Sequence, residues 1–170
     1  MNKLRSLLLL AVLSAVGPFA GTAVGEENDQ AALGRALQGA KATLQGGLQA
    51  SEREGQPISG KFEIEDGKLQ LSVYTMKNGG FTEVVLDPVT GAIAKSEKIS
   101  EGDDLKAAKE QSAAMAKAKR SLRAVTETAI AGNEGSRAVS LVPELTGGRA
   151  VAQVTLQQGN NFKKIAAPLD

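Results

Sequence analysis

Apolar residues recur every three or four positions in one early segment of the chain. They are Leu33, Leu37, Ala40, Leu44 and Leu48. This spacing places them on one side of an α-helix, so we expect a helix over about residues 29–51, capped by Asn28 or Asp29. Gly46 and Gly47 within that segment either let the helix lie close to a sheet or end it early.

The same spacing returns in the second half of the chain. Its apolar positions are Met115, Ala118, Leu122, Val125 and Ala129. They predict a packed helix over about 114–131, which ends at Gly132-Asn133. Residues 100–113 begin with acidic residues typical of a helix start, and their apolar side chains other than Leu105 are small. We expect this segment to be a linker or a helical extension.

Alternating apolar and polar positions follow each predicted helix and indicate β-strands. Turn sequences such as Asp66-Gly67 and Asn78-Gly79-Gly80 separate these strands. In the first half, strands are expected at 58–65, 69–76 and 81–86, with a fourth from 92 to 94 or as far as 99. In the second half, strands are expected at 138–145, 150–156 and 162–166.

Residues 58–86 align with residues 139–167 without a gap, at a constant offset of 81 positions. The identical pairs are Ser59/Ser140, Glu63/Glu144, Gly67/Gly148, Val73/Val154 and Phe81/Phe162. We therefore expect an α+β protein of two tandem units, at 29–99 and 114–170. Each unit would be a helix packed on an antiparallel meander of three or four strands, and the second would be truncated at its end.

Composition narrows the chemistry that is open to this chain. Its 170 residues include no Cys, no His and no Trp. Disulfides, thiolate nucleophiles and histidine general bases are therefore excluded, and so is zinc held by Cys or His. The 20 basic and 19 acidic residues nearly cancel, which is not the charge balance of a nucleic-acid-binding protein.

The first 25 residues have the three-part layout of a secretory signal peptide. Lys3 and Arg5 make a positive start, an apolar run occupies 6–19, and small residues follow. Cleavage is expected after Ala23 or Gly25, which leaves a periplasmic or secreted protein. The alternative is an uncleaved membrane anchor, although the run is shorter than the roughly 20 residues that span a bilayer.

A helix followed by an antiparallel meander that ends in Val85-Leu86-Asp87-Pro88-Val89-Thr90-Gly91, behind a signal peptide, resembles the PepSY family. The helix ALQGAKATLQGGL, the strand LQLSVYTM, Phe81 and Val84 carry the rest of the likeness. The second unit, at 114–170, resembles the family as a second tandem copy, but less closely, because it lacks the Thr-Gly end. That resemblance implies a non-catalytic module outside the cytoplasm, which binds or restrains peptidases or serves in sensing or assembly. It brings no catalytic residues, and any peptidase would be a separate chain.

Two groups of side chains are candidate sites. Asp87 and Thr90, with Pro88 and Gly91 in the family-motif turn, could orient a partner or ligate Ca²⁺, or they could simply cap the turn. The acidic residues Glu63, Glu65 and Asp66 could act as acid and base or gather a cation, or they could lie on a solvated outer face.

Basic side chains suggest two further surfaces. One is a local run of Lys106, Lys109, Lys117, Lys119, Arg120 and Arg123. It could attract anionic lipid, or it could be the solvated face of a helix. The other is an edge strand, at 92–98 or 162–166, which could pair with an extended peptide. Its lysines, at 95, 98, 163 and 164, could instead protect the edge from aggregation.

We expect a non-catalytic binding module with a protein partner, a peptidase in trans being one such partner. No cofactor, no metal site, no nucleic acid and no membrane contact after signal cleavage are expected. The alternative is a periplasmic protein that binds a small molecule or a cation. A hydrolase that relies on carboxylates alone is a more distant alternative, because aromatic residues, which line glycosidase clefts, make up only 3% of the chain.

Overall fold

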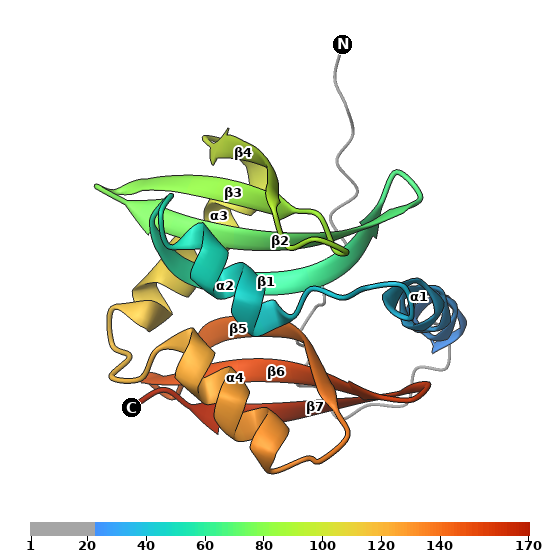
Figure 1. Ribbon diagram of the computed structural model, residues 1–170. Helices are drawn as coiled ribbons and strands as arrows, with labels where there is room; N and C mark the ends of the chain where they lie inside the picture. Colours follow the sequence, from blue (N-terminus) through green and yellow to red (C-terminus); the bar gives the residue numbers. More distant parts are fainter. Residues whose placement is uncertain (1–22) are drawn as a thin grey trace.

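The computed structural model describes residues 23–170. The predicted signal peptide therefore lies outside the described residues, apart from Ala23–Gly25, which begin the first helix. The described part of the chain forms one antiparallel sheet flanked by helices (Figure 1). The strands are β1 (Gln56–Glu65), β2 (Lys68–Lys77), β3 (Gly80–Leu86), β4 (Ile93–Ile99), β5 (Arg137–Thr146), β6 (Arg149–Gln158) and β7 (Asn161–Pro168).

The sheet has the order β4-β3-β2-β1-β5-β6-β7, and every neighbouring pair is antiparallel. Local sequence explains the hairpins. At the β1–β2 turn, Asp66 and Gly67 both adopt positive φ, of 49° and 74°, as a two-residue hairpin turn requires. The predicted strands and their turns are thus present, and β4 extends as far as Ile99.

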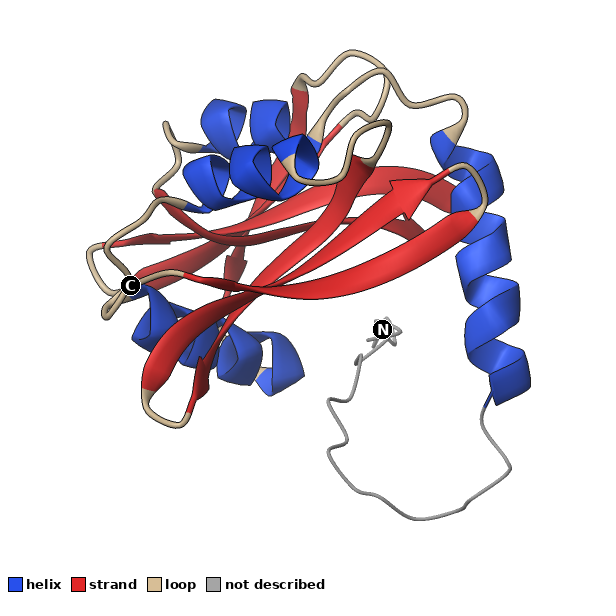
Figure 2. Ribbon diagram, turned by 90° about the horizontal axis from the view of Figure 1, so that it is seen from below, coloured by secondary structure: helices blue, strands red, loops and turns tan. Residues whose placement is uncertain are grey.

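Within residues 23–170, four helices surround the sheet. They are α1 (Ala23–Leu37), α2 (Leu44–Ser51), α3 (Gly102–Met115) and α4 (Leu122–Ala131). Figures 1 and 2 show α2 and α4 side by side on one face of the sheet, α3 on the opposite face and α1 at one end. We call the face under α2 and α4 the first face and the face under α3 the second face.

The expectation of two tandem units, each a helix on its own meander, is wrong. The strands β1 and β5 pair at the centre of a single seven-stranded sheet, with Gly60 opposite Leu141 and Lys61 opposite Ser140. This pairing satisfies the backbone groups that two separate meanders would leave exposed on β1 and β5. It also joins the apolar faces of both halves into one core.

Corresponding positions of the two halves nevertheless occupy corresponding places in this sheet. The β1–β2 register shifts between Pro57 and Ser59, and the β5–β6 register shifts between Ala138 and Ser140, 81 positions later. The β2–β3 and β6–β7 registers agree in the same way. An approximate twofold relation therefore connects β1–β3 with β5–β7 across the β1–β5 pair.

The single helix predicted over 29–51 is two helices, α1 and α2. Residues 38–43 separate them because the N–H groups of Lys41 and Ala42 donate to the carbonyl of Pro88, at 3.0 and 2.9 Å, instead of to a preceding helical turn. Thr43 then caps α2 by accepting from the N–H of Gly46. Of the two roles open to Gly46-Gly47, close approach to the sheet is the one observed: a Cβ on Gly47 would lie 2.4 Å from Leu71 Cδ2.

The helix predicted over 114–131 is interrupted in the same manner. The N–H groups of Lys119 and Arg120 donate to the carbonyl of Leu169, at 2.7 and 3.0 Å, and Ser121 caps α4. The segment expected to be a linker or extension forms α3, which begins at Gly102 and packs on the second face against β5 and β1. Ala108 is completely buried there, so small side chains permit close helix–sheet contact.

Candidate functional site

The Asp87–Gly91 turn is built from its own side chains. Asp87 Oδ1 accepts from the N–H of Val89 at 3.0 Å, the N–H of Thr90 at 2.7 Å and the hydroxyl of Thr90 at 2.9 Å. These donors favour the charged carboxylate and hold the pKa of Asp87 below its usual range. Gly91 adopts a φ of 72°, which favours glycine. The carboxylate of Asp87 thus accepts its hydrogen bonds from residues of the turn itself.

The same turn positions distant backbone. The Pro88 carbonyl in this turn accepts hydrogen bonds from the α1–α2 segment. The Leu169 carbonyl, 81 positions later, accepts hydrogen bonds from the α3–α4 segment. Each carbonyl accepts two successive N–H groups just before a capped helix that packs on the first face. The family-motif turn therefore positions α2, and the chain beyond β7 positions α4.

A polar network lies on the second face. Gln70 Nε2 donates to Glu63 Oε1 at 3.2 Å, Glu65 Oε2 at 2.8 Å and Ser72 Oγ at 3.0 Å. Lys61 pairs with Glu63 at 2.6 Å. The structure therefore brings Glu63 and Glu65 together, as their shared strand face predicts. Gln70 donates to both carboxylates, and Lys61 forms an ion pair with Glu63. Asp66 lies in the hairpin turn instead.

Three further residues extend this network, and sequence reasoning missed them. The hydroxyl of Tyr74 donates to Asp104 Oδ1 at 2.8 Å, which ties β2 to the first turn of α3. Burial, together with Asp104 and neighbouring carboxylates, raises the pKa of Tyr74. Burial, with the charge of Glu63 next, also raises the pKa of Glu83. Strand alternation could have placed Tyr74 and Glu83 on one face, but the position of Asp104 depends on how α3 packs.

Hydrogen bonds and one ion pair engage the acidic side chains of this network. Within residues 23–170, no group of three or more acidic side chains has the geometry to hold a metal ion. The carboxylates of Glu63 and Glu65 share one amide donor, Gln70 Nε2. This arrangement fits an internal stabilising role, in which polar side chains satisfy one another beside α3.

A separate depression of about 230 Å³ lies at the end of the sheet near α1. Arg137 lines it and donates to the carbonyls of Leu37 and Ala42, at 2.9 and 3.0 Å, while its guanidinium lies 5.3 Å from the Phe62 ring centre. Desolvation lowers the pKa of Arg137. This residue, which the sequence analysis did not single out, fastens the α1–α2 segment to β5.

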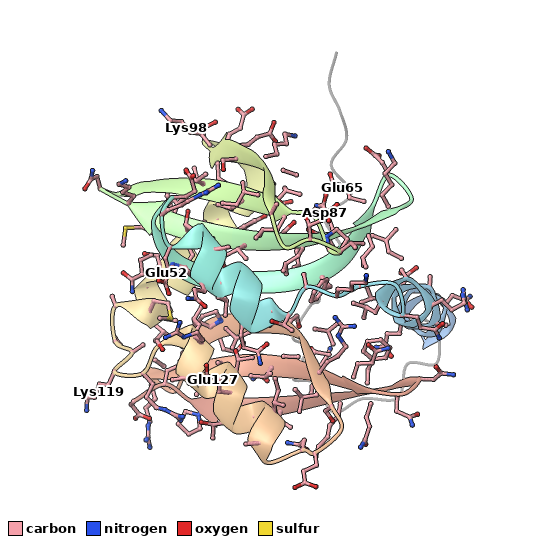
Figure 3. All side chains as sticks on the ribbon, viewed as in Figure 1. Glu52, Glu65, Asp87, Lys98, Lys119 and Glu127 are labelled. Carbon is pink, nitrogen blue, oxygen red and sulfur yellow. The ribbon has the colours of Figure 1, made fainter. Side chains whose placement is uncertain are left out.

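The predicted basic run does not form one surface. Lys106 and Lys109 belong to α3, Arg123 to α4, and the others to the connecting segment, where Lys119 lies at the outside of the molecule (Figure 3). Two of these side chains bind nearby carbonyls: Lys117 donates to Gly148 and Arg120 donates to Pro168. The alternative of one solvated helix face is wrong in assuming a single helix, because two helices and a turn divide the run.

The two predicted edge strands are the outermost strands of the sheet. β4 ends one side and β7 ends the other, and no strand within residues 23–170 pairs with their outer edges. Their lysines are exposed, and Figure 3 shows Lys98 projecting from β4 away from the sheet. Both strands thus offer backbone groups to an added strand, with charge beside them.

Comparisons with known proteins leave the family open. No family model matches the chain, and no curated protein matches it. One solved structure, a putative lipoprotein from Clostridium difficile 630, is 13% identical and has a TM-score of 0.39, over 71% of this chain and 79% of that one. A likeness at that level carries no argument about function. Among the described helices, none combines the length and apolar character needed to cross a bilayer.

Proposed function

We propose that this chain is a non-catalytic, extracytoplasmic protein-binding module of PepSY-like character. The observation that carries the proposal is the pair of open sheet edges, β4 and β7, at opposite sides of a well-packed scaffold. An open edge binds an extended chain through backbone hydrogen bonds, without a deep pocket or a cofactor.

The polar side chains support a binding role over a chemical one. The carboxylates of Asp87, Glu63 and Glu65 are engaged by neighbouring donors. With no His and no Cys in the sequence, a general base poised near neutral pH would have to come from these groups or from lysine. A peptidase in trans is the partner class that the PepSY resemblance suggests.

The extracytoplasmic part of the proposal is supported by the N-terminal sequence. Lys3 and Arg5 precede the apolar run at 6–19, and small residues follow it. Export would place the module where secreted peptidases and envelope proteins are found. Fractionation of the source cells checks this part: recovery of the full-length chain in the cytoplasm would contradict it.

Affinity capture from the extracytoplasmic fraction tests the binding role. We expect a stoichiometric protein partner after mild cross-linking, together with a change in the activity of a co-purified peptidase if the partner is one. Recovery of no partner, with no effect on extracytoplasmic peptidase activity, would contradict the proposal. A Ca²⁺-dependent rise in the melting temperature would favour the cation-binding alternative instead.

A further inference from the structure

The two halves of the sheet differ at their outer edges. In the first half, β4 pairs with the outer edge of β3, and Thr82 faces Lys98 while Glu83 faces Glu97. The strand β7 holds the place that corresponds to β3, because Val84 faces Val73 as Ile165 faces Val154. No described strand occupies the position beside β7 that corresponds to β4.

The residues at this vacant position are basic. Lys163 and Lys164 stand where β3 carries Thr82 and Glu83. Both lysine side chains are exposed. Lys163 donates to Asn133 Oδ1 at 2.9 Å, a neutral acceptor, and Lys164 makes no ion pair or hydrogen bond with the residues that the structure describes. Two successive positive charges on opposite faces of β7 therefore lack an acidic partner across the edge.

These charges also discriminate between possible occupants. A second copy of β7 would bring another pair of lysines to the edge, and a second copy of β4 would bring Lys95 and Lys98. Like charges on adjacent strands are unfavourable, whereas opposite charges facing each other across strands are favourable. An acidic strand therefore fits this edge better than another copy of the chain.

We propose that the outer edge of β7 binds an extended acidic segment of a partner protein as an antiparallel eighth strand, with carboxylates facing Lys163 and Lys164. This inference rests on the proposed function, because it names the binding edge and the chemistry of the bound segment. The β3–β4 pairing supplies the register: the partner residues facing Lys163 and Lys164 take the places of Lys98 and Glu97.

Two synthetic peptides test the inference. Both have the sequence of residues 92–99; the acidic peptide carries Lys98→Glu, so that glutamates face both lysines, and the basic peptide carries Glu97→Lys. Each is titrated into isotope-labelled full chain while backbone amide shifts are followed. We expect saturable shifts of residues 161–168 with the acidic peptide and binding weaker by on the order of tenfold with the basic one.

Charge reversal on the protein gives the matched control. The double variant Lys163→Glu/Lys164→Glu is expected to prefer the basic peptide, whereas Lys95→Glu/Lys98→Glu on the opposite edge is expected to keep the preference of the unaltered protein. The inference is overturned by the absence of shifts at millimolar peptide, by equal binding of both peptides, or by shifts confined to residues 93–99.

Failure of the edge assignment and failure of the proposed function are distinguishable. If affinity capture recovers the same partner with Lys163→Glu/Lys164→Glu as with the unaltered protein, the binding role stands and β7 is not the binding edge. If neither protein recovers a partner, the proposed function fails, and the peptide titration still decides whether β7 accepts an acidic strand.

Discussion

Gly47 of α2 lies directly against Leu71 of β2, so closely that a Cβ at position 47 would be 2.4 Å from Leu71 Cδ2. Leu71 is completely buried. The contact lets a helix of only eight residues seat on the first face. A glycine that would be unfavourable in an isolated helix is therefore required by the packing of this one.

Gly47→Ala is expected to destabilise the protein. Overpacking of a buried site costs about 1–3 kcal/mol, and the better helix propensity of Ala returns at most about 1 kcal/mol. A net loss of about 1 kcal/mol would lower the melting temperature by roughly 2–4 °C. Gly34→Ala in α1 is the matched control, because its nearest neighbours would be 3.5 Å away. An equal or higher melting temperature for Gly47→Ala would contradict the close contact.

Asp87→Ala is expected to lower the melting temperature by removing the acceptor of three hydrogen bonds in the turn. Asp87→Asn keeps an oxygen acceptor and should lose less. The pKa of Asp87 is lowered in the folded protein, so its charge stabilises the fold above the unfolded pKa, and that stabilisation is lost as pH falls through the folded pKa. The deficit of Asp87→Ala should therefore shrink in acid. A deficit that does not change with pH would contradict this role of the charge.

Glu83→Gln is expected to raise the melting temperature at pH 7. The pKa of Glu83 is raised, chiefly by burial and then by the charge of Glu63. Its folded state therefore favours the protonated form, and stability present below the unfolded pKa is lost as pH rises through the folded pKa. The gain from Glu83→Gln should disappear in thermal melts below about pH 4. Glu134→Gln, at an exposed position after α4, is the control; a gain for Glu83→Gln of the same size at every pH would refute the explanation.

Arg137→Met is expected to destabilise the protein by about 2 kcal/mol, since it removes two charge-assisted hydrogen bonds and a cation–π contact while keeping an apolar stem. Hydrogen exchange should show the loss first at residues 38–43. Arg137→Lys should rescue little of it, because a single ammonium lacks the planar fork that reaches the carbonyls of both Leu37 and Ala42. A stability of Arg137→Lys equal to that of the unaltered protein would contradict this role of Arg137.

Local sequence predicts some features of this fold well and others poorly. The hairpin at Asp66-Gly67 follows from residues that adopt positive φ, so it could be predicted directly. The break between α1 and α2 could not, because it depends on the carbonyl of Pro88, which is distant in sequence. The single sheet likewise depends on a long-range pairing, Gly60 with Leu141. The sequence pattern therefore predicts the elements but not how the two halves join.

In the candidate site, too, local sequence predicts some features, while others depend on long-range packing. Alternation along β1 placed Glu63 and Glu65 on one face, and the structure joins them through Gln70. The position of Asp104 against Tyr74 required knowledge of how α3 crosses the second face. The edge positions of β4 and β7 could be predicted from the sequence, because a meander must begin or end at an outer strand unless another segment pairs with it.

The most direct test of the protein-binding role is hydrogen exchange on the full chain, alone and with the partner that cross-linked affinity capture recovers. We expect the partner to protect the backbone amides of β7, residues 161–168, and we expect Lys163→Glu/Lys164→Glu to remove this protection together with binding. If none of the recovered proteins changes hydrogen exchange anywhere in this chain, the claim that it is a binding module is contradicted.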